Sequence, residues 1–409
     1  MLCKRLKSIA KLNPGKRCFG CAVLLAALFS VTGQAYAMTY VLPAKGDVIG
    51  QVQYASAKST DTLKKLARLY DVGISQIKAA NPDIVSNKLK AGQRVVIPSR
   101  HILPKGPREG IVINIAEQRL YYYSRPDEGP ALVSTYPISV GPEGKSRLGN
   151  YKVEKRLRKP SWNVPVSLRA ANSRLPEVMP PGPKNPLGEY GMSLDRGGYM
   201  IHGTNEPYSI GTKVYRGSIR LYPEDIAVLV RRTEKGVPVR IVNESFKYGY
   251  KNGALYFEIH KPPGVKGDIN LAALVNLVTK IIPDQLWADG WQKIRMTGEQ
   301  ASGIATPISM VRGKTKYPKR WRLRLATYKS YTTARKFMLQ LEELGVPVSV
   351  EGCERGKCVM YAGPFTDYTY MKNLAKRMKW ITRVKSVIVP YNPKDNIKTE
   401  LGNKLALTQ

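Results

Sequence analysis

The sequence predicts a multidomain α+β protein. A small βααβ module, a mainly-β sandwich or barrel domain and a βαββαβ domain are expected to follow one another. With 409 residues the chain is too long for one hydrophobic core. Its apolar residues follow helical spacing in some segments and strand alternation in others. Stretches of loop composition separate the folded segments.

The first 37 residues have the pattern of a secretory signal peptide. Six basic residues precede an apolar run over 18–31, and Ala35-Tyr36-Ala37 forms an A-x-A site, so we expect cleavage before Met38. An uncleaved membrane anchor is the alternative, but the run is shorter than the ~20 residues that span a bilayer. No later stretch is apolar enough to span, so no integral membrane segment is expected after cleavage.

The chain carries a large excess of positive charge. Sixty-six Lys and Arg residues oppose 30 Asp and Glu residues, and removing the six basic residues of 1–37 leaves 60 against 30, a net charge of +30. Such a balance indicates polyanionic partners. Export excludes nucleic acid, so peptidoglycan and anionic envelope polymers are the expected counter-charge. A merely solvated basic face is the alternative.

Cysteine usage agrees with an oxidising compartment. Only Cys353 and Cys358 remain after residue 37, and they flank the tight loop 354–357. An even count favours a disulfide there, with two reduced thiols as the alternative. Two Cys and the chain's three His make a poor ligand set, so we expect no metal, and we expect no cofactor.

Residues 50–99 have the order strand, helix, helix, strand. D-T-L at 61–63 opens an amphipathic helix with Asp61 as the expected N-cap, N-P at 81–82 ends a second helix, and V-V-I-P at 95–98 forms a strand. These pieces resemble LysM, a module that binds glycan containing N-acetylglucosamine. A spacer without glycan affinity is the alternative.

Residues 106–244 contain mainly β-patterned runs. The pattern predicts a sandwich or barrel with one helix, at 223–233. Strands are expected at 110–115, 119–123, 131–140, 151–156, 198–201 and 237–242. An extension over 245–297 should hold a hairpin around Asn252-Gly253 and a helix at 268–282. Residues 298–318 have the composition of a linker.

Residues 319–391 contain an internal duplication. Strand, helix, strand is followed by strand, helix, strand, with L-A-T-Y-K-S at 325–330 and A-G-P-F at 362–365. This order and these motifs resemble a SPOR domain, a family that binds glycan strands stripped of their stem peptides. The resemblance implies a second contact with peptidoglycan.

Chemistry is expected in three closely spaced motifs of the central domain. M-I-H-G-T-N at 200–205 is followed by S-I-G at 209–211 and R-G-S-I-R at 216–220. Together with P-I-S-V-G at 137–141, they resemble L,D-transpeptidase catalytic domains of the YkuD/ErfK type, whose last motif reads S-H-G-C or S-S-G-C before I-R. In that family the Cys attacks a stem-peptide carbonyl, D-alanine leaves, and an amine accepts the acyl group.

The resemblance implies a role for each position. His202 stands at the base position, Ser218 at the nucleophile position, and Gly217 in the oxyanion-hole segment. Arg220 could hold a stem-peptide carboxylate bidentately. The other expected substrate-binding residues are Gly203, Thr204 and Arg216.

Position 218 departs from the family pattern, because Ser replaces Cys. A hydroxyl ionises far less readily than a thiol and needs stronger activation, such as a His oriented by a carboxylate. His202 is the only His of 106–244, and the sequence shows no orienting carboxylate. Catalysis by the family route is therefore not expected.

Three functions remain open at this point. The preferred one is a peptidoglycan-binding protein of the cell wall, with lost or altered catalysis, whose partners are glycan strands, stem peptides and other cell-wall enzymes. The second is a serine enzyme that forms an acyl intermediate on Ser218. The third is a structural wall linker. The combination of domains points, by analogy, to a Gram-negative periplasm.

Overall fold

The computed structural model describes residues 38–86, 88–141, 148–212, 218–261, 288–310, 320–343, 346–353, 357–365, 367–382 and 386–391, and the single positions 274, 276 and 278. The expected signal peptide lies outside these residues, and so does most of the helix expected at 268–282. Within them, no helix has both the length and the apolar character needed to cross a membrane.

The βααβ module is confirmed. Strand β3 (Gln53–Ser56) pairs antiparallel with β4 (Arg94–Ile97), and α1 (Leu63–Leu69) and α2 (Ile74–Ala79) lie between them in the chain. The helix cap differs from the prediction by one residue. Thr62 caps α1, because its Oγ1 accepts the Lys65 N–H at 3.2 Å, whereas Asp61 accepts from the Lys58 N–H instead.

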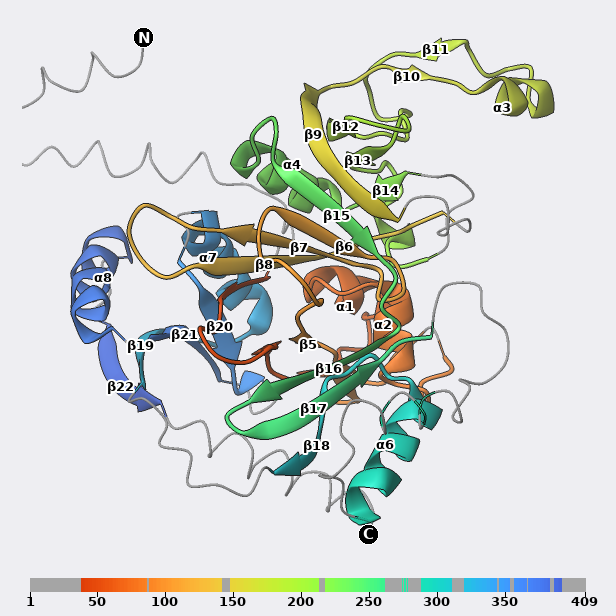
Figure 1. The fold of residues 1–409 in the computed structure, drawn as a ribbon. Coiled ribbons are helices and arrows are strands. Elements are labelled where there is room, and N and C mark those ends of the chain that lie inside the picture. Colours follow the sequence, from red (N-terminus) through yellow and green to blue (C-terminus); the bar gives the residue numbers. More distant parts are fainter. Residues whose placement is uncertain are drawn as a thin grey trace, which may run out of the picture. The chain divides into compact units, whose positions relative to one another are not determined.

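The central domain is built on one nine-stranded sheet (Figure 1). Its strands, in spatial order, are β1 (Met38–Val41), β8 (Leu132–Pro137), β7 (Arg119–Ser124), β6 (Ile111–Asn114), β15 (Pro238–Val242), β9 (Gly149–Arg158), β12 (Tyr190–Leu194), β13 (Met200–His202) and β14 (Ile219–Arg220). The domain is mainly β, as predicted, but its principal strands do not divide into two sheets.

The sheet curls until its two ends meet. Ser139, just beyond β8, forms an antiparallel bridge with Arg220 of β14, with N–H···O distances of 2.9 and 3.0 Å. Because β8 is the second strand and β14 the last, this bridge brings opposite ends of the sheet together. Helix α4 (Pro223–Arg232) follows β14, and its Ile226 and Leu229 are fully buried in the core with Ile201.

An excursion interrupts the sheet between β9 and β12. It contains β10 (Trp162–Asn163), α3 (Val166–Ala171) and β11 (Val178–Met179), and no residue of α3 is buried. Figure 1 shows these elements extending away from β9 and β12. The loop returning from β11 leads through Asn185 and Leu187 to β12.

The expected hairpin is confirmed as β16 (Phe246–Lys251) and β17 (Ala254–Ile259), which pair antiparallel next to β2 (Val48–Gly50) and β5 (Arg100–Ile102). The expected linker 298–318 is folded in part, because α6 (Ala288–Gln300) continues into it and β18 (Thr306–Met310) pairs with β17. The Gly, Ser and Pro residues of 298–318 predicted a loop, but Pro307 lies in β18, and Pro is tolerated in an edge strand.

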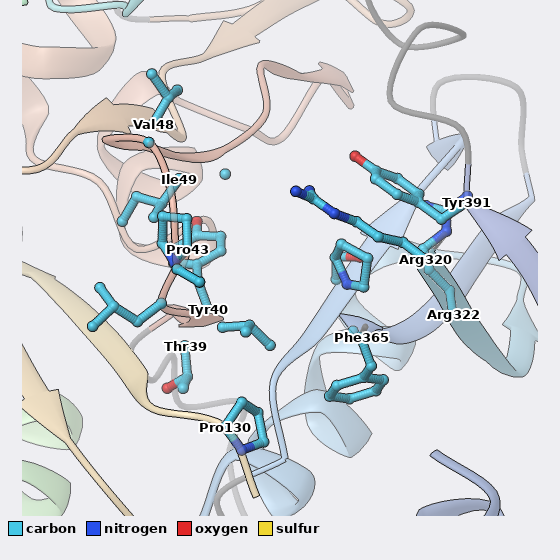
Figure 2. A pocket seen from close by; sticks show the side chains of 18 of the residues that line it. Thr39, Tyr40, Pro43, Val48, Ile49, Pro130, Arg320, Arg322, Phe365 and Tyr391 are labelled. Carbon is cyan, nitrogen blue, oxygen red and sulfur yellow. The ribbon is translucent and has the colours of Figure 1, made fainter. Parts of the chain in front are cut away.

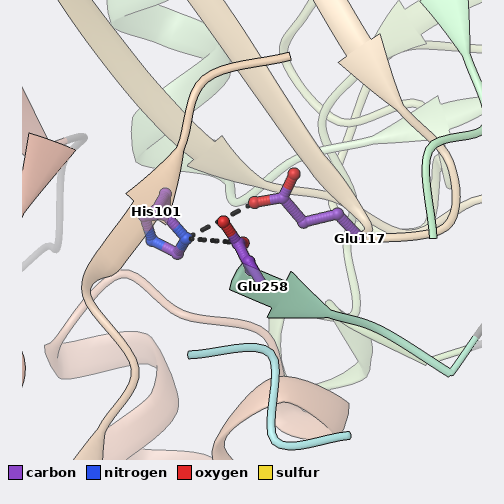
Figure 3. Close-up of side chains that lie close together, drawn as sticks. All are labelled: His101, Glu117 and Glu258. Carbon is purple, nitrogen blue, oxygen red and sulfur yellow. Dashed lines mark ion pairs between the residues drawn. The ribbon is translucent and has the colours of Figure 1, made fainter. Parts of the chain in front are cut away.

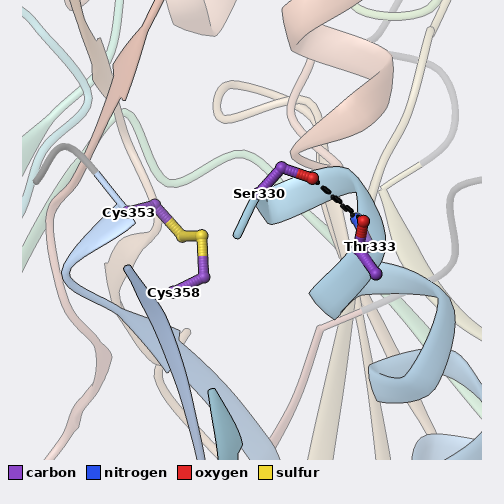
Figure 4. Close-up of a disulfide and its surroundings, with 4 residues drawn as sticks. All are labelled: Ser330, Thr333, Cys353 and Cys358. Atoms are coloured by element: carbon purple, nitrogen blue, oxygen red, sulfur yellow. Dashed lines mark hydrogen bonds between the residues drawn. A yellow bond between two sulfur atoms is a disulfide. The ribbon is translucent and has the colours of Figure 1, made fainter. Parts of the chain in front are cut away.

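The C-terminal domain has the predicted βαββαβ order. The elements are β19 (Arg320–Tyr328), α7 (Tyr331–Glu343), β20 (Val348–Glu351), β21 (Cys358–Phe365), α8 (Tyr368–Thr382) and β22 (Val387–Tyr391), and the sheet order is β20-β21-β19-β22. A disulfide joins Cys353 to Cys358 between β20 and β21, while Ser330 begins α7 by bonding to Thr333 (Figure 4).

Candidate active site

His202 lies at the end of β13, between two neighbouring strands. It pairs with Gly191 of β12 on one side and with Arg220 of β14 on the other. A Cβ atom at Gly191 would come within 3.2 Å of the His202 Cβ, so the glycine keeps this side of the histidine clear. The sheet therefore fixes the position of the histidine backbone on both sides.

The ring of His202 is held by a backbone carbonyl. Nδ1 lies 2.7 Å from the carbonyl oxygen of Gly203. A carbonyl can only accept a hydrogen bond, so Nδ1 is the donor in this contact, and the carbonyl of Leu187 is a second backbone partner of the ring. The Gly203 carbonyl is the orienting group that the sequence did not reveal, because any residue type supplies a backbone carbonyl.

Burial controls the charge of His202. The side chain is 3% exposed. Loss of solvation, together with the positive charge of Arg220, lowers the pKa of His202 to about 4, although the carbonyl of Gly203 acts in the opposite direction. The imidazole is therefore neutral at neutral pH and is a weak base.

Ser218 and Arg220 join this histidine on the adjoining strand. Ser218 is half-buried and directly precedes β14. Side chains two residues apart on a strand share a face, and Arg220 is in register with His202 across a parallel pair. Arg220 and His202 therefore share a face, and extending the alternation of β14 back by two residues places Ser218 on that face. Burial lowers the pKa of Arg220, and Glu206 partly offsets this.

The remaining expected substrate residues are only partly described. A Cβ atom at Gly203 would come within 3.2 Å of Ile226, so no larger residue fits without displacement. Thr204 is buried, and its Oγ1 accepts the backbone N–H of Glu206 at 3.0 Å, which fixes the following turn. Arg216 and Gly217 lie outside the described residues.

Ser139 joins the S-I-G turn to the site. Its Oγ donates to the carbonyl of Ser209 at 3.1 Å and accepts the N–H of Gly211 at 3.0 Å, while its backbone bridges Arg220. The sequence analysis did not single out Ser139. Its motif, P-I-S-V-G, was the available signal.

The βααβ module contacts the same turn. The N–H of Ile74, at the start of α2, donates to the carbonyl of Ile210 at 3.0 Å. Gly73 and Gly211 meet backbone to backbone, since a Cβ atom on Gly211 would lie 2.5 Å from the Gly73 Cα. Nearby, two charge-assisted hydrogen bonds of 2.8 and 2.9 Å join Arg68 of α1 to Glu224 of α4.

Comparison with known families identifies the two modules. Residues 108–241 match YkuD, the L,D-transpeptidase catalytic domain, and residues 57–98 match the LysM domain. The probable L,D-transpeptidase YbiS of Escherichia coli is 38% identical over 252 residues, which cover 58% of this chain and 81% of that protein. The chain belongs to the L,D-transpeptidase family.

Further relatives agree with this assignment. The probable L,D-transpeptidases YcfS and ErfK/SrfK of Escherichia coli are 36% and 35% identical over 256 and 246 residues, which cover 59% and 58% of this chain and 79% and 78% of those proteins. The LysM domain and the L,D-transpeptidase domain together imply peptidoglycan binding. The resemblance of 319–391 to SPOR stays a prediction.

The Gly73–Gly211 contact gives a test of how the LysM domain is held on the L,D-transpeptidase domain. Gly211→Ala is expected to destabilise the protein by about 1–3 kcal/mol more than Gly236→Ala. Both glycines have a similar φ, +85° and +88°, but no atom lies within 4 Å of a Cβ built at Gly236. Urea unfolding of both variants measures the difference, and equal losses would show that the contact is absent in solution.

A second group of polar side chains lies in the core, away from the L,D-transpeptidase motifs. His101 Nδ1 is 3.4 Å from Glu117 Oε1 and 3.6 Å from Glu258 Oε1 (Figure 3). The ammonium of Lys247 contacts both carboxylates, at 2.7 and 3.1 Å. The sequence analysis counted only Cys and His as metal ligands and so did not foresee this group. The ammonium of Lys247 is the positive charge that the two carboxylates of this group share.

This core group extends to the LysM domain. Gln76 of α2 donates to the carbonyl of Glu117 at 2.6 Å, and its Oε1 accepts from Arg119 at 2.8 Å. Tyr121 donates to Glu117 at 2.5 Å.

A separate pocket of about 1580 Å³ lies away from this group. It is lined by Tyr40 and Pro43 on one side and by residues of the C-terminal domain, such as Arg320, on the other (Figure 2). His202, Ser218 and Arg220 do not line it.

Proposed function

We propose that this protein is a periplasmic, peptidoglycan-binding member of the L,D-transpeptidase family that acts in cell-wall organisation. In this proposal its transpeptidase pocket binds stem peptides, but catalysis is lost or altered because Ser218 stands at the nucleophile position. The observation that carries the proposal is the combination of Ser218 with a buried His202 whose pKa is about 4.

The chemistry of this pair supports the proposal. Proton transfer is efficient when the pKa values of base and nucleophile are close. A thiol with a pKa near ~8.5 can lose its proton to a nearby neutral imidazole, whereas a hydroxyl is a much weaker acid. A carboxylate partner would stabilise the imidazolium that forms, but the described partner of Nδ1 is the carbonyl of Gly203.

The same site keeps features that suit binding. Arg220 is half-buried beside His202 and could pair with a stem-peptide carboxylate. The LysM domain adds a glycan contact, the SPOR-like order of 319–391 would add another, and the net charge favours an anionic wall. Removal of a signal peptide before Met38 would deliver the protein to the periplasm.

A serine enzyme is the second candidate. The neutral imidazole favours it, because this is the state in which a histidine accepts a proton from a nucleophile. In that case Ser218 would form an acyl-enzyme with the stem peptide. A structural wall linker is the third candidate, and loss of peptidoglycan binding on mutation of the pocket would count against it.

The chain from Met38 onward, incubated with tetrapeptide muropeptides, tests the proposal by mass spectrometry. We expect no release of D-alanine and no acyl adduct from the wild type or Ser218→Ala. Ser218→Cys is expected to gain both, because the thiol restores a nucleophile that His202 can deprotonate. Adding His202→Gln to Ser218→Cys should lower this activity by about 100-fold or more.

The competing outcome is equally clear. Turnover by the wild type that disappears in Ser218→Ala would establish a serine enzyme and contradict the proposal. Binding to purified peptidoglycan, measured with the wild type, Ser218→Ala and Ser218→Cys, serves as the control for folding, and it should be the same in all three.

A further inference from the structure

Met38, the residue that follows the expected cleavage site, has a buried backbone nitrogen. Met38 begins β1, pairs with Thr135 of β8 and is 6% exposed. Its backbone nitrogen donates to Oδ2 of Asp71 at 3.1 Å. Asp71 follows α1 in the LysM domain and is 1% exposed. The Asp71 carboxyl group of the LysM domain therefore accepts a hydrogen bond from β1, the first strand of the L,D-transpeptidase sheet.

The surroundings of Asp71 hold two buried carboxyl groups close together. Burial raises the pKa of Asp71 to about 6, although Arg335 and Arg119 act in the opposite direction. Burial, and then the charge of Asp71, raise the pKa of Asp225 in the first turn of α4 well above its usual range. No N–H group of the described residues donates to Oδ1 of Asp71.

Other titratable groups face this site. Glu224 is paired with Arg68, and the phenol of Tyr222 donates to the carbonyl of Val72 at 3.1 Å. The pKa of Tyr222 is raised well above its usual range by burial and by the neighbouring carboxyl groups. A neutral amide at Met38 adds no charge to this acidic site, whereas an ammonium would add a positive charge.

We propose that hydrolysis of the Ala37–Met38 bond turns the Met38 nitrogen into an α-ammonium that forms a buried ion pair with Asp71, so that maturation completes the joint between the LysM domain and the catalytic sheet. The proposal rests on the proposed export and cleavage. Hydrolysis consumes one water, leaves a carboxylate on Ala37 and an amine on Met38, and the amine takes up a proton. An α-amine has a usual pKa of about 7.7–8.0.

The positive charge of the Met38 ammonium changes the hydrogen bonds that Asp71 can accept. An ammonium offers three hydrogens where the amide offers one, so it can reach Oδ1 as well as Oδ2 of Asp71. A charge-assisted hydrogen bond is stronger than a neutral one. A precursor that retains Ala37 keeps a neutral amide at Met38, so the buried Asp71 has only the charges of Arg335 and Arg119 and its hydrogen bonds to oppose the cost of burial.

The test compares four purified chains. Two begin at Met38 and carry either Asp71 or Asp71→Asn, and two begin at Ala37 with the same pair of residues. In the chains that begin at Met38, Asp71→Asn is expected to lower the thermal unfolding midpoint by roughly 6–10 °C, because it leaves the ammonium buried without a counter-charge. In the chains that begin at Ala37, the same substitution should be neutral or stabilising.

The pH dependence gives a second prediction that differs between the two backgrounds. In the chain that begins at Ala37, the folded pKa of Asp71 lies above the unfolded value, so stability falls as pH rises from about 4 to about 6. In the chain that begins at Met38, the ammonium lowers the Asp71 pKa and this fall should disappear. Asp83→Asn, at an exposed position, is the control and should change neither result.

Equal effects of Asp71→Asn in both backgrounds would overturn the proposal. Labelling of the α-amine in the chains that begin at Met38 checks the ion pair independently. An amine-reactive label should react at least 10-fold more slowly with the chain that carries Asp71 than with Asp71→Asn. N-terminal sequencing of the exported protein separates the two proposals. A different first residue would contradict the proposed cleavage, whereas Met38 without coupling would contradict the ion pair alone.

Discussion

Lys247→Met is expected to destabilise the folded protein by about 3–5 kcal/mol. The Lys247 ammonium is fully buried, and it lies 2.7 Å from Glu117 and 3.1 Å from Glu258. Methionine keeps an unbranched apolar side chain one atom shorter than that of lysine, but it removes the charge and the hydrogen bonds. Two buried carboxylates would then remain close together without their shared cation.

The carboxyl pKa values explain the size of this effect. Burial acts to raise the pKa of Glu117, but Lys247 and His101 outweigh it and hold the pKa well below its usual range. Burial also opposes ionisation of Glu258, yet Lys247 is again the main counter-charge, and the pKa is about 2. Both groups are therefore ionised at neutral pH in the wild type.

Urea unfolding at pH 7 measures the loss, with Lys235→Met as the control at an exposed position. The control should change stability by less than about 0.5 kcal/mol. The loss in Lys247→Met should shrink at low pH, where the carboxyl groups can be protonated. A loss below about 1 kcal/mol at pH 7 would contradict the buried charge network.

His202→Gln is expected to remove a pH-dependent part of the stability. The folded pKa of His202, about 4, lies below the unfolded value of 6.5. Between these values the unfolded chain binds a proton that the folded chain does not, so stability rises with pH across this window. The contribution is complete above pH 6.5 and is lost as pH falls toward 4, by about 3 kcal/mol.

Urea unfolding at pH 4.5 and pH 7.0 checks this prediction. The wild type should lose more stability on acidification than His202→Gln, by a few kcal/mol, since glutamine does not titrate. Ser218→Ala changes the neighbouring strand without removing a titrating group, so it should keep the wild-type difference. Equal acid sensitivity in His202→Gln and the wild type would show that His202 is not held neutral.

Local patterns predicted much of the fold. Asn252 and Gly253 both have positive φ values, +54° and +75°, which explains why Asn-Gly correctly predicted the hairpin β16–β17. The βααβ module and the βαββαβ order were also predictable, because each of their elements carries its own periodicity. β18 was missed, because its five residues contain a proline and pair only at an edge.

The candidate site was predictable only in part. His202, Ser218 and Arg220 stand in recognisable motifs, and the sheet places them on one face. The carbonyl that orients His202 left no trace in the sequence. The contact of Lys247 with Glu117 joins residues 130 positions apart, so no local spacing could reveal it.

The joint between the LysM domain and the turn at 209–211 affects how two weak contacts could combine. When a flexible linker joins a glycan-binding domain to a second binding site, the second site can reach ligands over a whole range of distances from the bound glycan. Here Gly73 meets Gly211 and Arg68 pairs with Glu224, and these contacts hold the LysM domain at one distance from the turn at 209–211. If the site at His202 binds stem peptides as proposed, avidity requires a stem peptide at one fixed distance along the glycan strand from the sugars that the LysM domain would hold, and peptides at other distances gain nothing.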